Sequence, residues 1–423
     1  SLSRRLSLTK QETLEKPTSD WIYDNKTSSS NEGDIMDARA GAREQFATVQ
    51  DKLTAIRRDI HAHPELGFEE EKASTWIADM LADAGFTVQR GICDLPTAFI
   101  ARAGNGPLHI GICAEYDCLP GIGHACGHNI IAAMAVGAAI AAAKVANDVG
   151  LTVSVIGTPA EEAGDGGGKI LLLERGGYKG MHAAMMVHPA PFDVVDPAII
   201  ACSTFEVRYT GKESHASAFP ERGINAADAL TVAQTAIGLL RQHIRSTDRI
   251  HGIITKGGDA PNVIPAHTVA KYIVRAKTLA DLDEIKTKVL RCFEAGALAT
   301  GSTLDILGGQ KPYAEHVTDP EIAALYQRNA ETLGRVIRDL GPTRDRAAGS
   351  TDMGTVSLAM PSVHPFIGLN SLPAVNHHPE FTAHSPPPAA DKAVIDGGLA
   401  MAWTAIDLAT NVKVRGRLLQ RVG

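Results

Sequence analysis

The sequence predicts an α/β protein whose mostly parallel sheet is flanked by helices, with a smaller α+β domain inserted into the larger one. Short apolar, partly β-branched runs alternate with helical segments, which is typical of a largely parallel sheet. These runs are 108–113, 151–157, 183–187 and 363–368. From about Ala201 to Gly309 the order changes to β-α-β-α, and the first pattern resumes near Asp319. A chain of 423 residues is long enough for two such domains.

The helices of the larger domain are expected where apolar residues recur every three or four positions. The first starts at Asp37 and ends near His63-Pro64, because a residue before proline disfavours the α region. The second covers 73–84 and is stopped by Gly85. Further helices of this domain are expected at 129–146 and 322–340. The expected elements of the insert are a strand at 203–209, a helix at 226–244, a strand at 267–278 and a helix at 282–297.

The domain boundaries follow from composition and from this alternation. The larger domain is predicted to comprise 37–200 and 315–412, and the insert 201–314. The remaining segments, 1–36 and 413–423, are expected to be tails, the first of them flexible. The N-terminal tail is rich in serine and other polar residues, which bury little surface. Because arginines and serines lead it, a transit-peptide remnant is the alternative interpretation.

Composition excludes several classes of function. Hydrophobic residues make up 44% of the chain and charged residues 21%, as in ordinary globular proteins. A net charge of −7 without a long basic run disfavours nucleic acid as a partner. The most apolar stretch, Ile130 to Ala143, is too short to span a bilayer, so no membrane partner is expected. The six cysteines have no Cys-x-x-Cys spacing, which favours a reducing compartment and a cytoplasmic location.

Polar side chains follow three of the predicted strands at the point where each strand ends. Glu115 and Asp117 follow the first, Glu161 and Glu162 the second, and His188 the third. In open α/β sheets, ligands bind beyond the carboxyl ends of the strands. The sequence therefore predicts a functional site at this edge of the sheet.

A group of metal-ligand residue types lies between the first two of these strands. In Gly121 to Asn129, His124, Cys126 and His128 are spaced two residues apart at the start of an alanine-rich helix. A thiolate and a neutral imidazole are good ligands for zinc and similar divalent metals. The alternative is a buried structural thiol beside polar histidines, but the neighbouring acids favour a metal site.

The adjacent carboxylates Glu161 and Glu162 suggest a division of labour, in which one ligates a metal while the other accepts a proton from water. His384 precedes the final helix, and His377 and His378 compete with it as a further ligand. Neither a complete phosphate-binding loop nor a Gly-x-Ser-x-Gly nucleophile motif occurs. Nucleotide binding and serine hydrolysis therefore lack their usual support.

Several motifs resemble metallopeptidase family 20, and the resemblance runs from about Asp37 to Asn411. They are AEYDCLPGIGHACGHN, TPAEEAGDGGG, MVHP, GKESHASAFPERGINAADA, APNVIP and GSTDMGTVS, in the order expected for the family. The resemblance is closest to the cysteine-containing branch, among members similar to β-alanyl-lysine dipeptidase and p-aminobenzoyl-glutamate hydrolase. It implies a zinc-peptidase-like larger domain and an inserted domain that serves as a lid or forms a homodimer.

The resemblance also implies roles for individual residues. Two divalent ions, zinc first and otherwise manganese or cobalt, would be held by Cys126, His128, Glu162, His188 and His384. Glu161 would be the general base, and His215 would contact the scissile carbonyl or its oxyanion, often across a dimer interface. The residues implied in substrate binding are Asn262 and Arg275, for a carboxylate, and Gly349, Ser350 and Thr351, which would line the pocket.

The predicted function is metal-dependent hydrolysis of the amide bond in a dipeptide or an N-acyl amino acid. A first alternative keeps the chemistry but changes the substrate to p-aminobenzoyl-glutamate or another aryl–amino-acid conjugate. A second alternative, from another class, is a non-catalytic homodimeric binding protein on the same fold. The sequence leaves the acyl group, the preferred side chain and the native metal open.

Overall fold

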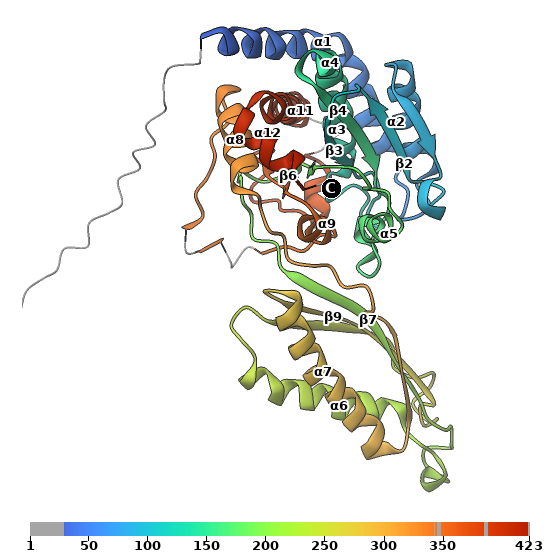
Figure 1. Ribbon diagram of the computed structural model, residues 1–423. Helices are drawn as coiled ribbons and strands as arrows, with labels where there is room; N and C mark the ends of the chain where they lie inside the picture. The colour runs from blue at the N-terminus through green and yellow to red at the C-terminus, as the bar shows by residue number, and fades with distance from the viewer. Residues whose placement is uncertain (1–28, 342, 345–347, 385–387, 422–423) are drawn as a thin grey trace, which may run out of the picture.

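The structure is a computed structural model that describes residues 29–341, 343–344, 348–384 and 388–421. It contains the two domains that the sequence predicts, and Figure 1 shows the insert projecting away from the larger domain. Most of the expected N-terminal tail, 1–28, lies outside the described residues. The first helix, α1 (Ser29–Ala62), begins eight positions before the expected start at Asp37.

The larger domain is built on a six-stranded sheet with the order β1-β2-β4-β3-β5-β11. The strands β3, β4, β5 and β11 run parallel, while β1 and β2 add an antiparallel edge. Their bounds are β1 (Thr87–Arg90), β2 (Phe99–Ala103), β3 (Leu108–Ala114), β4 (Leu151–Gly157), β5 (Ala183–Met185) and β11 (Ser362–Val363). The predicted strand at 363–368 is divided, because its second half, β12 (Phe366–Gly368), pairs with β6 (His188–Ala190) in a separate two-stranded sheet.

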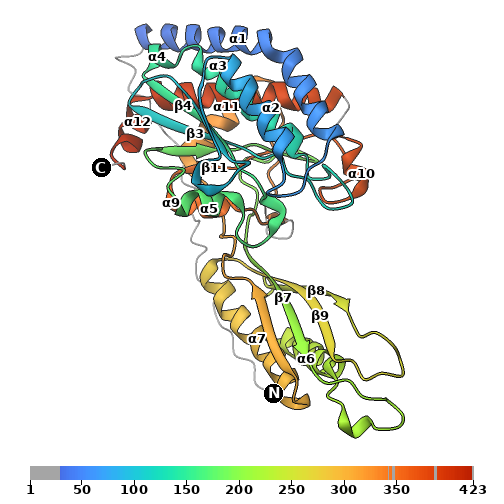
Figure 2. The same ribbon diagram turned by 90° about the vertical axis from the view of Figure 1, so that its right-hand side faces the viewer.

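Three helices pack closely on one another in the larger domain: α1, α3 (His128–Ala143) and α11 (Pro388–Thr410) (Figure 2). Small residues allow this approach, since a Cβ at Gly137 of α3 would lie 2.5 Å from the Phe46 ring of α1. The described helix α11 is long and apolar enough to cross a membrane, but 89% of its apolar window is buried inside the protein. Its composition therefore reflects its place in the core.

The remaining helices of the larger domain are shorter. They are α2 (Glu71–Asp83), α4 (Ala146–Val149), α5 (Gly168–Glu174), α8 (Pro320–Thr332), α9 (Met353–Ala359), α10 (Pro379–Thr382) and α12 (Val412–Leu419). Helix α8 ends before the predicted 340 because Gly334 adopts a left-handed φ of 86°, which favours glycine and ends helices. The segment 413–423, expected as a tail, instead includes most of α12, whose Val414 and Leu418 are buried.

The insert is an antiparallel four-stranded sheet with the order β10-β7-β9-β8. Its strands are β7 (Ala201–Thr210), β8 (Arg249–Lys256), β9 (His267–Ala276) and β10 (Thr303–Gly308). Helices α6 (Ala226–Leu240) and α7 (Leu279–Thr300) pack on one face of this sheet, around Phe205, Tyr272 and Phe293. The two predicted strands and both predicted helices are present, while β8 and β10 were not anticipated.

Candidate active site

The side chains predicted at the sheet edge converge in the structure. Among the described residues, ligand atoms of Cys126, His128 and His188 all lie within 4.8 Å of one another. A second group with the same spacing consists of Cys126, Glu162 and His377. Cys126 therefore belongs to two sets of metal-ligand residue types, as expected of a thiolate shared by two ions.

The backbone around Cys126 is fixed by Gly127. This glycine has a φ of 86°, and a Cβ at this position would lie 2.5 Å from Pro189, so both conformation and space require glycine. Helix α3 starts at the next residue, His128. Asn376 donates from its amide to the carbonyls of Cys126 (3.2 Å) and Pro189 (2.9 Å), which ties the strand-end loops to a distant segment.

Asp117 orients two of the candidate ligands. Its Oδ1 lies 2.9 Å from Nδ1 of His128, and its Oδ2 accepts the backbone N–H of Glu162 at 2.9 Å. With Nδ1 of His128 directed at this carboxylate, Nε2 remains buried and without a hydrogen-bond partner. Metal-binding histidines commonly have this arrangement, with one ring nitrogen bound to a carboxylate and the other free for the ion.

The remaining candidate ligands lie close to this centre. Nε2 of His188 is 3.4 Å from the Cys126 sulfur, while its Nδ1 lies 2.8 Å from the Pro189 carbonyl oxygen. Nε2 of His377 is 3.2 Å from Oε1 of Glu162. Thiolate, imidazole and carboxylate donors with a buried, unpartnered imidazole nitrogen fit divalent zinc-like ions.

The protonation states support a strongly charged centre. Burial alone raises the pKa of Cys126, but His188 and His128 outweigh it and hold the pKa well below its ordinary value. Burial and then the charge of Cys126 raise the pKa of Glu162 to about 7. Hydrogen bonds to Cys126 and Glu162 raise the pKa of His377 to about 11. The neighbouring histidines thus stabilise the thiolate in the metal-free chain, a role that divalent cations would take over if bound.

Glu161 is a buried carboxylate beside these ligands, with Oε2 3.9 Å from Nε2 of His128. Burial and then the neighbouring Glu162 raise its pKa well above the ordinary value. The preceding Ala160 has a left-handed φ of 57°, and its N–H donates to Oε1 of the buried Glu70 at 2.8 Å. The Tyr313 hydroxyl donates to the Glu161 carbonyl at 2.6 Å. Hydrogen bonds therefore fix the backbone on both sides of the Glu161 side chain, at the Ala160 N–H and at the Glu161 carbonyl.

A buried ion-pair network that sequence reasoning missed lies next to Glu161. Nζ of Lys169 is 2.5 Å from Glu115 and 2.6 Å from Asp352, and all three side chains are fully buried. Oxygens of Glu115, Glu161 and Asp352 also form one group within 4.8 Å. Lys169 follows a glycine run that resembles an incomplete phosphate loop, and nothing in that local pattern indicates a buried ion pair.

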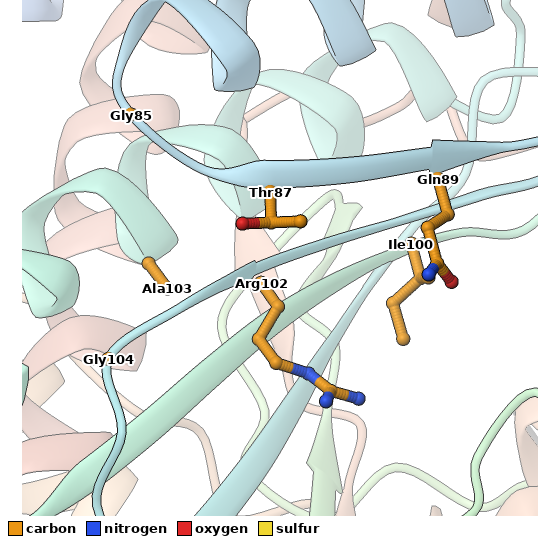
Figure 3. A pocket seen from close by; sticks show the side chains of 7 residues that line it. All are labelled: Gly85, Thr87, Gln89, Ile100, Arg102, Ala103 and Gly104. Atoms are coloured by element: carbon orange, nitrogen blue, oxygen red, sulfur yellow. The ribbon is translucent and has the colours of Figure 1, made fainter.

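A cavity of about 1010 Å³ opens beside the candidate ligands, between the larger domain and the insert. Arg275, Gly349, Ser350 and Thr351, all predicted to bind substrate, line it, and Arg275 donates to the Ser350 hydroxyl at 2.7 Å. Its volume is at the upper end of the usual range for small-molecule sites. A smaller cavity of about 360 Å³ lies along β1 and β2 (Figure 3), and none of the candidate ligands lines it.

Three predicted site residues lie elsewhere. His384 belongs to none of the ligand groups found among the described residues. His377 lies instead in the group with Cys126 and Glu162, at the position that was predicted for His384. The backbone N–H of His377 donates to the Ala125 carbonyl at 3.0 Å, which holds this loop against the Cys126 segment. His215 and Asn262 are exposed on neighbouring loops of the insert and do not line the cavity. The arrangement favours His377, one of the alternatives left open by the sequence, as the last ligand.

Comparison with known proteins identifies the same family. Residues 202–300 match the M20 peptidase dimerisation domain. The chain is 36% identical over 397 residues to the Xaa-Arg dipeptidase of Mus musculus, a match that covers 90% of this chain and 91% of the relative. It is 33% identical over 292 residues to one of the subunits of p-aminobenzoyl-glutamate hydrolase from Escherichia coli K12, covering 64% of this chain and 59% of that protein.

The fold is also similar to that of solved structures. A dinuclear metal binding peptidase of the M20 family from Bacillus subtilis superposes with a TM-score of 0.63 at 22% identity. That match covers 86% of this chain and 99% of the solved chain. Together with the relatives of more than 30% identity, it confirms the family resemblance drawn from the motifs. The chain belongs to the M20 peptidase family.

Proposed function

We propose that this protein is a dinuclear-metal hydrolase that cleaves the amide bond of a dipeptide or an N-acyl amino acid. The observation that carries the proposal is the position of Cys126 in two overlapping ligand groups, directly beside the buried carboxylate of Glu161. The relatives named as a dipeptidase and as a p-aminobenzoyl-glutamate hydrolase both support amide hydrolysis of this type.

The residues have separable roles in the reaction. Two divalent ions held by Cys126, His128, Glu162, His188 and His377 would polarise the scissile carbonyl and lower the pKa of water. Glu161, with its raised pKa, is suited to accept a proton from the attacking water and to deliver it to the leaving amine. Asp117 fixes the ring of His128 and the backbone of Glu162, so both ligands are positioned before substrate binds.

Zinc is the proposed metal, because thiolate and imidazole ligands favour it over magnesium or calcium. The alternatives are manganese and cobalt, and metal analysis of the purified protein distinguishes them. About two ions per chain are expected. Fewer than one ion per chain after incubation with each metal in turn would contradict the dinuclear assignment.

The substrate proposal is tested on a panel of dipeptides, N-acetyl amino acids and p-aminobenzoyl-glutamate, with and without chelator. Release of a free amino acid that stops with chelator and returns with metal is the expected result. Aryl conjugates are included because Phe192, Val194 and Ile199 form an apolar part of the cavity wall. Absence of hydrolysis across the panel by metal-loaded protein would favour the non-catalytic binding function.

We further infer that the insert forms a homodimer. The match to a dimerisation domain supports this, as does β8, an edge strand whose Ile253 and Ile254 are 65% and 50% exposed. Exposed apolar residues on an unpaired edge favour pairing with another chain. The exposed positions of His215 and Asn262 are consistent with action in the partner's cavity.

Sedimentation analysis tests the dimer directly. Ile253→Lys with Ile254→Lys should shift a dimer to a monomer, whereas Val412→Lys, at a similarly exposed site on the larger domain, should not. A wild-type chain that sediments as a monomer at micromolar concentration would contradict the inference.

A further inference from the structure

The loop between β11 and β12 places a buried histidine, His364, in the wall of the active-site cavity. His364 is 2% exposed, and the centroid of its ring lies 5.6 Å from that of the candidate ligand His188. The ring of Phe366, which is on β12 and also lines the cavity, lies 5.9 Å away. His364 therefore borders both the metal centre and the space in which a substrate binds.

Neither ring nitrogen of His364 has a hydrogen-bond partner among the described residues, although both are buried. Burial disfavours the charged form of an imidazole, and the neutral form offers one N–H donor and one acceptor nitrogen. Because unpaired buried polar groups are costly, those that face a cavity are candidates for hydrogen bonds with a ligand.

The neighbouring His316 determines which of these two functions remains for a ligand. The Thr318 hydroxyl donates to Oδ1 of Asp196 at 2.6 Å, so it accepts the Nδ1–H of His316, which lies 3.2 Å away. Nε2 of His316 is then an acceptor, and it is buried without a partner in the described part of the chain. The rings of His316 and His364 are 6.0 Å apart, and an N–H of His364 on this side complements the acceptor. The other ring nitrogen of His364 is thereby left as an acceptor.

This acceptor nitrogen lies in an otherwise apolar part of the cavity wall. Val194 pairs with Phe366 through the backbone, and the Ile199 carbonyl accepts the backbone N–H of His316 at 3.2 Å. The side chains of Val194, Ile199 and Phe366 all line the cavity and offer no hydrogen-bonding atom. An N–H or O–H group that pairs with His364 therefore comes from the substrate.

The chemistry of the substrate limits what this donor can be. With the scissile carbonyl at the metal ions, the amine-side half offers a variable side chain, a carboxylate that only accepts, and the scissile N–H, which every candidate substrate shares. The acyl half of a dipeptide carries an amino group one or two carbons from the carbonyl, whereas a hydrocarbon acyl group carries no donor. An amino group in that position is close to a ring that borders the ligand His188.

We propose that His364 binds the substrate by accepting a hydrogen bond from an amino group on its acyl half, so that aminoacyl substrates are preferred to N-acyl amino acids with hydrocarbon acyl groups. This assignment rests on the amide hydrolysis proposed above. His364 differs in role from its neighbour His188, because it contacts the substrate and not a metal ion.

Matched substrates test the requirement for an amino group. The alanyl, β-alanyl and propionyl derivatives of one amino acid, chosen as the best leaving residue in the panel, are compared by kcat/KM. The propionyl group is either aminoacyl group without its amine, so only the donor differs. We expect the better aminoacyl substrate to be preferred over the propionyl substrate by about 10- to 100-fold, because the propionyl group leaves His364 unpaired.

Variants of His364 test whether this residue is the source of the preference. His364→Phe keeps an aromatic ring but removes both nitrogens, and it should reduce the preference to within about threefold. His364→Asn and His364→Gln each retain an acceptor oxygen, and at least one of them should recover part of the preference. Metal affinity, measured by chelator competition, should stay unchanged in all three, whereas a merely structural role beside His188 would lower it.

Two control variants separate His364 from other groups in the cavity. Phe366→Leu removes a ring that packs on both His188 and His364 but no hydrogen-bonding atom, so the preference should remain. Asp248 is the one carboxylate outside the metal centre among the described cavity-lining residues, and its Oδ1 is also buried and unpartnered. Asp248→Asn tests this competing position for the amino group and should leave the preference intact.

Equal cleavage of the propionyl and aminoacyl substrates by the wild-type enzyme would overturn the proposal, as would a His364→Phe variant that keeps the preference. Loss of metal from that variant, or loss of the preference in Asp248→Asn alone, would also contradict it. If a variant does not fold, the comparison of substrates with the wild-type enzyme still decides. Failure of the proposed hydrolysis is distinct, because none of the three substrates would then be cleaved.

Discussion

Replacing Lys169 with methionine should destabilise the larger domain more than any surface substitution. Its ammonium lies 2.5 Å from Glu115 and 2.6 Å from Asp352, and all three side chains are fully buried. Methionine is similar in length but uncharged, so two carboxylates would remain buried without their cation. Removing one partner of a buried ion pair typically costs about 3–5 kcal/mol, and we expect a loss of that size in the free energy of unfolding at pH 7.

Urea denaturation of the metal-free protein, followed by tryptophan fluorescence, measures this loss. The control is Lys179→Met, because Lys179 is exposed and its replacement should change stability by less than about 0.5 kcal/mol. Burial raises the pKa of Asp352, so protonation at lower pH should relieve part of the cost, and the difference between variant and wild type should shrink from pH 7 to pH 5. A loss below about 1 kcal/mol at pH 7 would refute the reasoning.

Three further predictions follow from the site and its surroundings. His377→Ala should lower metal affinity by at least about tenfold in a chelator competition, while His384→Ala should leave it unchanged; the reverse would restore His384 as the ligand. Glu161→Gln should retain its metal and lose about 10²- to 10⁴-fold in kcat, and loss of metal instead would show that Glu161 is a ligand. Burial lowers the pKa of His109 to about 4, so the unfolded chain binds the extra proton between pH 6.5 and 4 and stability falls as the pH drops through this window. His109→Asn should flatten that slope by at most about 1.4 kcal/mol per pH unit, and an unchanged slope would assign the effect to other groups.

The central strands were predictable because a strand that is buried on both faces consists mainly of apolar residues. All residues of β3 and β4 are buried, and both appear as mostly apolar runs. Strand β8 has the opposite character: only Ile250 is buried, so neither an apolar run nor a regular alternation marks it. An edge strand that is largely exposed in a single subunit cannot be recognised from its hydrophobic pattern.

The candidate site was predictable where its residues directly follow these strands. Glu161, Glu162 and His188 lie at the ends of β4 and β5 in the structure, as the sequence indicated. The position of His377, the proposed last ligand, depends on tertiary contacts instead, because Asn376 donates hydrogen bonds to the carbonyls of Cys126 and Pro189 and so holds this segment in place. The local sequence does not indicate these contacts, so it could not decide whether His384 or His377 is the ligand.

Tyr313 connects the geometry of the two domains to that of Glu161, the proposed base. Its backbone exchanges hydrogen bonds of 2.9 and 3.0 Å with Cys202, at the point where the chain enters and leaves the insert. Its hydroxyl, at the other end of the ring, holds the Glu161 carbonyl. The aromatic ring is rigid. A rotation of the insert that moves the backbone pair of Cys202 and Tyr313 would therefore also act on the backbone of Glu161. Any movement of the insert around a substrate would therefore also shift the backbone of Glu161, the proposed base.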